Sequence, residues 1–464
     1  MTTNAGTARQ LDALGRGDLG GIRELRLSGG LTEFPRDLFG LADSLEILDL
    51  GAGSLTRLPD DLGRLTKLRV LFCSGNPFDR LPPALGDCPA LSQIGFRGCG
   101  LREVPGEALP PLLRWLTLTD NRIARLPDAI GQRRGLQKLM LSGNRLTALP
   151  ESLADAAHLE LLRLSANALD ALPAWLAALP SLAWPTWAGN PLEGGPLPAD
   201  DRRIPWSDLA VGERLGEGAS GQVFAALWKR DGIEAGESVT SNKPSTSNKP
   251  STSNKPSTSN KPATPNTPVA LKMFKGAMTS DGLPDREMEA CLAAGPHPNL
   301  TGGLGRLVDH PEGAQGLIMP RLPGAWRVLA GPPSLESCSR DVYEPGLSFD
   351  EEVVRAIARS IATAACHLHA GGLLHGDLYA HNVLWDGTMG EAVLSDFGAA
   401  CRLPPGDAGA SLRRIEVRAW GILLGELLAR CSAPLPDLVA LAEACTQPEV
   451  MRRPLMAEVV MALA

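Results

Sequence analysis

Residues 136–150 read LQKLMLSGNRLTALP, and residues 159–173 repeat the same pattern as LELLRLSANALDALP. The pattern LxxLxLxxNxLxxLP recurs through the first part of the chain with a period of 23 residues and one repeat of 22. Self-similarity at such a period predicts a solenoid, because no unit can bury its own leucines and each must stack on its neighbours. The units begin at Ile22, Leu45, Leu68, Leu91, Leu113, Leu136, Leu159 and Leu182.

Each unit divides into a short strand, a turn and a return segment. The LxL part predicts a strand whose leucines point inward, and the asparagine can bond to backbone groups that are left unpaired where the chain turns. The other strand positions would face the concave surface, where they offer mixed charge to a partner. These positions are Arg114, Trp115, Thr117, Gln137, Lys138, Met140, Glu160 and Arg163.

The units resemble leucine-rich repeats of the short intracellular LP type, over about residues 20–195. The resemblance implies an α/β repeat solenoid, the leucine-rich repeat horseshoe, over residues 21–195, with a cap or disordered segment at 1–20. It also implies that the concave face binds a protein substrate or regulator. The last unit has Pro185 and Trp187 where other units have leucine, and such atypical ends are typical of solenoid caps.

Composition narrows the class of protein and its location. The 464 residues carry a net charge of −7, which argues against a nucleic-acid partner, since such binding rests on a cationic surface. No apolar run is long enough for a membrane span, and the N-terminus lacks the apolar region of a secretory signal. The nine cysteines show no paired spacing. We therefore expect a cytoplasmic protein, and the abundance of Ala, Gly and Pro suggests a bacterial source.

A boundary and a low-complexity insert follow the repeats. Residues 196–205 are rich in proline and charge, which predicts a linker before a second domain at 206–464. Within that domain, Thr240–Ala263 consists of four hexads of the type TSNKPS, which contain almost no apolar side chain. Such a segment cannot offset the entropy of ordering, so we expect the insert at 230–268 to form a solvated loop between two strands.

Four short motifs in the second domain carry the chemistry. A glycine-rich turn, Gly216-x-Gly218-x-x-Gly221, lies between two apolar segments and can let backbone amides approach phosphate oxygens. A predicted strand, VALK, ends in Lys272, and a predicted acidic helix follows it. Further on stand HGDLYAHN at 375–382 and DFG at 396–398, whose acids and amide suit magnesium on phosphates.

In this order the motifs resemble the eukaryotic-like protein kinases, over about residues 206–464. The resemblance implies an α+β bilobal fold, with a small lobe at about 206–323 and a large lobe at about 324–464, and it implies ATP and Mg²⁺ as cofactors. Asp377 would orient and deprotonate the attacking hydroxyl, and Asn382 and Asp396 would hold the metal ions. The implied nucleotide-binding residues are Gly216, Gly218, Gly221, Val223, Ala270, Lys272, Glu287, Met319, Pro320 and Leu322.

The sequence departs from the kinase pattern at several positions. Gly376 replaces the usual arginine of the catalytic loop, and Tyr379 stands where Ser/Thr kinases carry a lysine. Only 17 residues separate DFG from Glu416, and no Ala-Pro-Glu motif lies among them. Arg453 therefore lacks its usual glutamate, unless Glu416 or another acid takes that place. A short segment of this kind offers little to be phosphorylated, so we expect a kinase that is not switched there.

Three functions remain in consideration. The first is a protein kinase, of the Ser/Thr rather than the Tyr type, whose repeats recruit a substrate or regulator. The second is a catalytically weak pseudokinase that acts as a scaffold through its repeats. The third is a small-molecule kinase, which the missing peptide platform would favour. The sequence also leaves open whether Glu287 or Glu289 pairs with Lys272, and it is silent on the acceptor and on the oligomeric state.

Overall fold

The computed structural model describes residues 5–195, 197, 202–218, 220–229, 266–276, 278–279 and 281–464. These residues form two compact units. The first unit contains residues 1–200, 275–303 and 323–464, and the second contains residues 201–274 and 304–322. The hexads Thr240–Ala263 lie outside the described residues.

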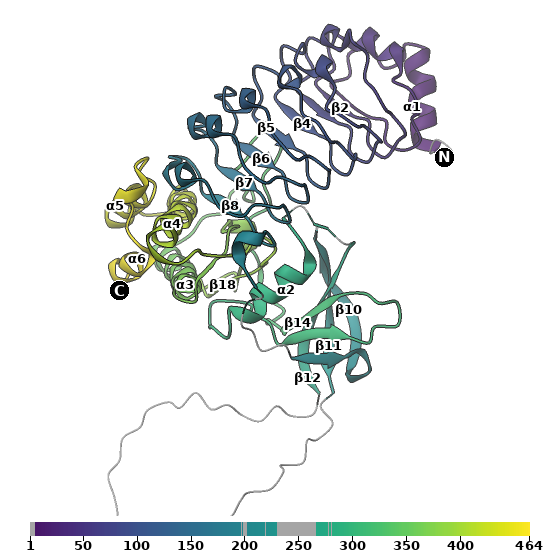
Figure 1. Ribbon diagram of the computed structural model, residues 1–464. Helices are drawn as coiled ribbons and strands as arrows, with labels where there is room; N and C mark the ends of the chain where they lie inside the picture. The colour runs from purple at the N-terminus through teal and green to yellow at the C-terminus, as the bar shows by residue number, and fades with distance from the viewer. Residues whose placement is uncertain are drawn as a thin grey trace, which may run out of the picture. The chain divides into compact units, whose positions relative to one another are not determined.

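The repeats form a solenoid with one parallel sheet, as the sequence predicts. Its eight strands pair in chain order and in register, from β1 to β8 (Figure 1). Each strand contains only three residues, because the chain must turn after every LxL segment. The strands are β1 Glu24–Arg26, β2 Ile47–Asp49, β3 Val70–Phe72, β4 Gln93–Gly95, β5 Trp115–Thr117, β6 Lys138–Met140, β7 Leu161–Arg163 and β8 Trp184–Thr186. Helix α1, Ala5–Gly15, precedes them.

A ladder of buried asparagines ties each repeat to the next. Asn144 Oδ1 accepts a hydrogen bond from the Ile123 amide at 3.0 Å, and its Nδ2 donates to the carbonyls of Leu118 and Leu141, each at 2.9 Å. The ladder confirms that the asparagine satisfies backbone groups at the turn. The same pattern recurs at Asn76, Asn121, Asn167 and Asn190.

A solenoid cap would cover the last repeat and face solvent, but here the last repeat packs against another part of the chain. All three residues of β8 are buried, and Trp187 is fully buried. Leu374 and Ile415 from the second half of the chain belong to the same apolar core as the repeat leucines. The indole Nε1 of Trp187 also donates to the Arg402 carbonyl at 2.9 Å. The atypical residues of this unit therefore form a contact with the later part of the chain.

The first unit also holds the larger helices (Figure 1). Helix α3 begins after Asp350 with two glutamates in its first turn, which suits the helix dipole. It ends at Ala370, and Gly372 beyond it has a left-handed backbone. No helix among the described residues is long and apolar enough to cross a membrane. The elements are α2 Pro284–Ala293, α3 Glu351–Ala370, α4 Gly406–Leu428, α5 Pro436–Cys445, α6 Met456–Ala462, β15 Arg327–Val328, β16 Leu373–Leu374, β17 Val383–Trp385, β18 Ala392–Leu394 and β19 Cys401–Arg402.

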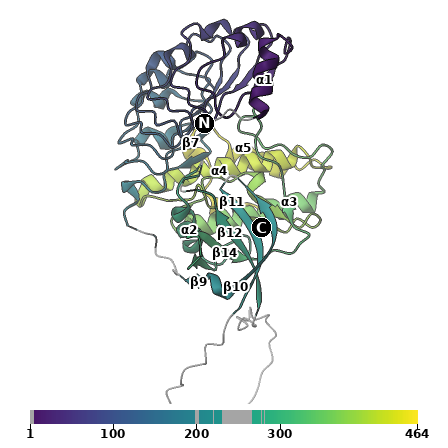
Figure 2. The same cartoon turned by 90° about the vertical axis from the view of Figure 1, so that its right-hand side faces the viewer.

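The second unit is built on a mixed sheet of order β10-β11-β12-β14-β13-β9 (Figure 2). Strands β11 and β12 are antiparallel, with Trp228 opposite Thr267, so an antiparallel pair brackets the low-complexity insert. The strands are β9 Arg203–Pro205, β10 Leu209–Glu217, β11 Gly221–Trp228, β12 Thr267–Phe274, β13 Gly305–Val308 and β14 Gly316–Pro320.

Replacing Asn144 by alanine should destabilise the repeats, because it leaves one amide and two carbonyls of the buried backbone without partners. We expect a loss of about 2–4 kcal/mol in the free energy of unfolding, measured by urea denaturation. Thr147, an exposed residue of the same repeat, provides the matched control, and Thr147→Ala should change stability by less than about 0.5 kcal/mol. Equal effects of the two substitutions would contradict the role of the ladder.

Candidate active site

Four residues implied in nucleotide binding share one face of the mixed sheet. Val223 lies opposite Lys272, and Ala270 lies opposite Met319. Directly opposed residues of antiparallel strands present their side chains on the same face, as do residues two apart on one strand. Lys272 is therefore placed beside small and apolar side chains, and it is only 7 % exposed.

The opposite face of the sheet supplies the apolar core of this unit. Side chains alternate along the regular strand β12, so the neighbours of Ala270 and Lys272 point away from the face that carries these two residues. The core residues are Ile204, Leu209, Ala226, Trp228, Val269, Leu271, Leu307 and Ile318.

The three glycines of the glycine-rich turn differ in what requires them. A Cβ at Gly221 would lie 2.3 Å from the Met273 carbonyl oxygen, so the close approach of β12 demands glycine there. Among the described residues, no atom lies within 4 Å of where a Cβ would be at Gly216 or Gly218. These two positions leave open space, as a turn that covers phosphates needs. Pro320 is exposed at the end of β14.

Asp377 and Asn382 are joined in the candidate catalytic loop, residues 374–382. Asn382 Nδ2 donates to the Asp377 Oδ2 at 2.7 Å and to the Asp377 backbone carbonyl at 2.9 Å. Asn382 itself lies at the end of a short 3-10 helix, Ala380–Asn382, which fixes its spacing from the aspartate. The structure thus brings these two predicted site residues into direct contact.

Asp396 and Glu287 meet at the glycine of the DFG motif. Asp396 has a left-handed backbone, with φ of 60°, and its Oδ1 accepts the Gly398 amide at 3.1 Å. A Cβ on Gly398 would lie 3.2 Å from Asp396 Oδ1 and 3.4 Å from Glu287 Oε2. The carboxylate of Glu287 therefore lies beside the DFG turn.

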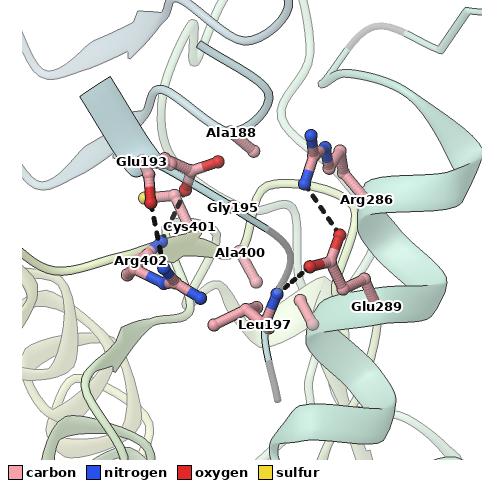
Figure 3. A pocket seen from close by; sticks show the side chains of 10 residues that line it. Ala188, Glu193, Gly195, Leu197, Arg286, Glu289, Ala400, Cys401 and Arg402 are labelled. Atoms are coloured by element: carbon pink, nitrogen blue, oxygen red, sulfur yellow. Dashed lines mark hydrogen bonds and ion pairs between the residues drawn. The ribbon is translucent and has the colours of Figure 1, made fainter. Parts of the chain in front are cut away.

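Glu289 is committed to other partners (Figure 3). Its Oε2 accepts a hydrogen bond from Arg286 Nη1 at 2.8 Å, and its Oε1 accepts the Leu197 backbone amide. These contacts lie in a small pocket that Glu193 and Arg402 also line. Of the two glutamates left open by the sequence, Glu287 is therefore the one placed beside the candidate site.

The residues of the loop fit the metal ion that the kinase resemblance implies. Asn382 donates from its amide nitrogen, which leaves its carbonyl oxygen as a ligand, and Asp396 brings a carboxylate. These are the hard oxygen donors that Mg²⁺ prefers when phosphates complete its coordination. Within the described ranges, no cluster of three or more His, Cys, Asp or Glu side chains is arranged to hold a metal.

Glu416 is hydrogen-bonded to the backbone of the candidate catalytic loop. Its side chain is fully buried, its Oε1 accepts the Gly376 amide at 2.7 Å, and its Oε2 lies 2.8 Å from His369 Nε2. It does not pair with Arg453, so that suggestion from the sequence was wrong. Arg453 instead donates to three backbone carbonyls, those of Gln447, Arg414 and Pro180. Burial and the nearby charge of Arg418 lower the pKa of Arg453 to about 9.

The repeats reach the candidate catalytic loop through Arg163, which the sequence offered only as a concave-surface residue. Its guanidinium forms an ion pair with Asp377 Oδ1 and donates to the Gly376 carbonyl at 2.8 Å. Its Nε lies 2.7 Å from Asp281 Oδ1. Burial alone would raise the pKa of Asp377, but the charge of Arg163 and those of two histidines outweigh it and hold that pKa below its usual value.

Tyr379 also contacts the repeats. Its ring stacks on the indole of Trp184, with centroids 4.0 Å apart and planes 11° from parallel. Trp184 Nε1 donates to the Leu378 carbonyl at 3.0 Å. The tyrosine that departs from the kinase pattern is thus explained by an aromatic partner supplied from β8. The sequence near Tyr379 could not predict this partner, because the two residues are almost 200 positions apart.

Family models match one segment in each half of the chain. A model of the leucine-rich repeat family matches residues 111–169, and a model of the lipopolysaccharide kinase (Kdo/WaaP) family matches residues 326–404. The chain joins leucine-rich repeats to a kinase-like domain. A leucine-rich repeat protein of Leptospira interrogans has a solved structure that is 26 % identical, covers 41 % of this chain and 53 % of its own, and has a TM-score of 0.34.

Curated relatives that are kinases match the chain over short stretches. The liver/testis gamma catalytic chain of human phosphorylase b kinase is 41 % identical over 67 residues, which is 14 % of this chain and 16 % of the relative. The Arabidopsis thaliana serine/threonine-protein kinase AtPK1/AtPK6 is 42 % identical over 59 residues, which is 13 % of this chain and 12 % of the relative. The chain thus spans less than a fifth of the length of these two relatives.

Gly376→Ala should be strongly destabilising. The residue has φ of 73°, and a Cβ there would lie 2.6 Å from the carbonyl oxygens of both Ala399 and Pro185. We expect a loss of at least about 2 kcal/mol in urea unfolding. Gly425 is an exposed glycine of helix α4 with nothing within 4 Å of a Cβ. Its replacement by alanine should instead stabilise by about 0.5–1 kcal/mol, and the same sign for both variants would contradict the crowding at Gly376.

The pair of His381 with Asp341 should make stability depend on pH. His381 Nδ1 lies 2.7 Å from Asp341 Oδ1, and although burial lowers the pKa of His381, the bond to Asp341 and the charge of Asp377 raise it overall. The pair stabilises the fold fully below about pH 6.5 and loses that contribution as pH rises through the raised pKa. The stability difference between wild type and His381→Asn, measured by urea unfolding from pH 6 to 9, should therefore shrink as pH rises. A difference that grows would contradict it.

Proposed function

We propose that this protein is an ATP-dependent phosphotransferase that acts on Ser or Thr hydroxyls of proteins. The observation that supports this most directly is the hydrogen bond between Asp377 and Asn382 in the candidate catalytic loop. This loop also contacts the residue before the DFG motif, because Ser395 Oγ donates to the Asn382 carbonyl at 2.8 Å. The short matches to Ser/Thr kinases favour the same acceptor class.

Each proposed role follows from the chemistry of the residue. Lys272, buried on an otherwise apolar sheet face, would neutralise phosphate charge, with Glu287 as its expected orienting carboxylate. Asn382 and Asp396 would hold Mg²⁺. Bound ATP supplies the phosphoryl group, and Asp377 would orient the acceptor hydroxyl and hold its proton at a carboxylate oxygen.

The adenine and phosphate contacts are proposed from the other predicted residues. The side chains of Val223, Ala270 and Met319 would pack on the base, while backbone groups of Pro320 and Leu322 would bond to its edge. Proline keeps the carbonyl that such recognition uses. The backbone amides near Gly216, Gly218 and Gly221 would cover the phosphates.

The repeats would recruit a protein partner. Three of the predicted concave residues, Arg114, Glu160 and Arg163, already contact the chain's own kinase-like domain. A partner substrate or regulator would then use the remaining concave positions or compete with these contacts. This role follows the general use of leucine-rich repeats in protein interaction.

A second candidate acceptor is the hydroxyl of a sugar. The match of residues 326–404 to a family of lipopolysaccharide kinases favours it, since that family acts on a saccharide. The residues that would transfer the phosphoryl group are the same. Only the surface that holds the acceptor would differ, so the two candidates are separated by the acceptor and not by the loop.

Asp377→Asn should abolish phosphoryl transfer and leave ATP affinity within about twofold, because the amide cannot hold the proton yet preserves the shape of the side chain. The assay supplies radiolabelled ATP and Mg²⁺ to the full chain, with a pool of Ser/Thr peptides in one reaction and purified lipopolysaccharide in another. Asp170→Asn, at an exposed position of the repeats, is the control and should retain full activity.

The outcomes of this assay separate the candidates. Label in the peptides supports a protein kinase, and label in the lipopolysaccharide alone supports the sugar acceptor. Turnover that is unchanged in Asp377→Asn would remove Asp377 from its role. ATP binding without any transfer, by the wild type or by any variant of the chain, would favour a scaffolding pseudokinase.

A further inference from the structure

The concave surface of the repeats holds a segment of the kinase-like domain. Gln93 on β4 donates to the Leu335 carbonyl at 2.5 Å, and Arg114 donates to the Glu336 carbonyl at 3.2 Å. Glu160 accepts two hydrogen bonds from Arg340, at 2.7 and 3.0 Å. The contact thus extends from β4 to β7 and uses charged and polar groups throughout.

The same surface continues to Asp377 and occupies its carboxylate. Arg163 is 2 % exposed and binds Oδ1, while Asn382 binds Oδ2 at 2.7 Å. Both oxygens of the proposed proton acceptor are therefore engaged within the chain. Asn382 belongs to the loop itself, whereas Arg163 comes from more than 200 residues earlier.

Trp184 covers the residues that follow Asp377. It stacks on Tyr379 and binds the Leu378 carbonyl, and it is only 1 % exposed. In the kinase resemblance, the position of Tyr379 carries a lysine beside the transferred phosphoryl group. An indole on this side chain places an apolar surface where an acceptor would approach.

The sequence of the loop matches the contact. A Cβ on Gly376 would lie 2.6 Å from the carbonyl oxygens of both Pro185 and Ala399, so the repeats and the kinase-like domain itself both exclude the arginine usual at this position. Gly376 offers its own carbonyl to Arg163 at 2.8 Å. The loop thus has no arginine of its own at this position, and the guanidinium beside Asp377 comes from the repeats.

We propose that Arg163 and Trp184 form a repeat latch that holds the kinase-like domain in an autoinhibited state. The proposal rests on the proposed function. An acceptor hydroxyl must come within hydrogen-bond reach of the Asp377 carboxylate, about 2.6–3.2 Å, and the latch fills the approach to Oδ1. Phosphoryl transfer to an external acceptor therefore requires β7 and β8 to move away from the loop.

A second ion pair holds Arg163 in the latch. Its Nε lies 2.7 Å from Asp281 Oδ1, while another nitrogen of the guanidinium contacts Asp377 Oδ1. Release of the guanidinium would thus restore access to the Asp377 carboxylate.

The test compares the full wild-type chain with the double variant Arg163→Met, Asp281→Asn. Removing both charges avoids leaving the Asp281 carboxylate without the guanidinium that it faces in the wild type. The matched control is Arg145→Met, Asp170→Asn, which makes the same two chemical changes at exposed positions of the repeats. The readouts are label transferred from ATP to the peptide pool, ATP affinity, and hydrogen–deuterium exchange of residues 373–382.

The latch variant should transfer label at least tenfold faster than wild type, with ATP affinity within twofold and faster exchange over residues 376–382. Transfer that is equal or slower than in an active wild type would overturn the latch, as would unchanged exchange. If no version transfers label to any acceptor, the proposed function fails and the latch proposal fails with it. Slower transfer with intact exchange would instead make Arg163 a residue that positions Asp377.

A second variant covers the case in which the double variant does not fold. Trp184→Leu removes the stacking on Tyr379 but leaves the ion pair of Arg163. It should raise transfer in the same direction by a smaller factor, about threefold. No increase in this variant, with a native melting profile, would contradict the proposal.

Discussion

A buried guanidinium must replace its hydrogen bonds to water by bonds to carboxylates or carbonyls. Arg163 bonds to both kinds of group, and all of them lie outside its own repeat. Its ion pairs with Asp377 and Asp281 cross from the solenoid to the kinase-like domain, where the guanidinium is buried and the two carboxylates are partly buried. Breaking one partner of such a buried set is costly, because the remaining charge is left without compensation. This constraint fixes the last repeats against the candidate catalytic loop.

Several departures from the kinase pattern follow from that arrangement. Gly376 has no room for a side chain between the carbonyls of Pro185 and Ala399, the first of them from the repeats, and Tyr379 stacks on Trp184. Arg453 needs no glutamate because three carbonyls, one of them from Pro180 of the repeats, satisfy it. These departures from the kinase pattern thus lie where the kinase-like domain contacts the repeats.

The sequence predicted what repeats or has local spacing, and it failed where distant segments meet. The period of leucines and asparagines was enough to predict the solenoid, since each unit obeys the same local geometry. The spacing of Asp377 and Asn382 likewise placed both side chains in one predicted cluster of oxygen donors, and the structure joins them by a hydrogen bond. Arg163 could be placed on the concave surface but not paired, because its partners lie more than 100 residues away. The cap expected at Trp187 failed for the same reason. No periodic signal records what covers the end of a stack.

The direct test of the central claim is a double-mutant cycle between Arg163 and Asp377 in the free energy of unfolding. The cycle uses Arg163→Met, Asp377→Asn and the combination, which isolates the coupling of the two side chains. The account predicts a coupling of about 2–5 kcal/mol, as for close and desolvated charge pairs. A coupling indistinguishable from zero would show that the repeats and the loop do not meet through this pair.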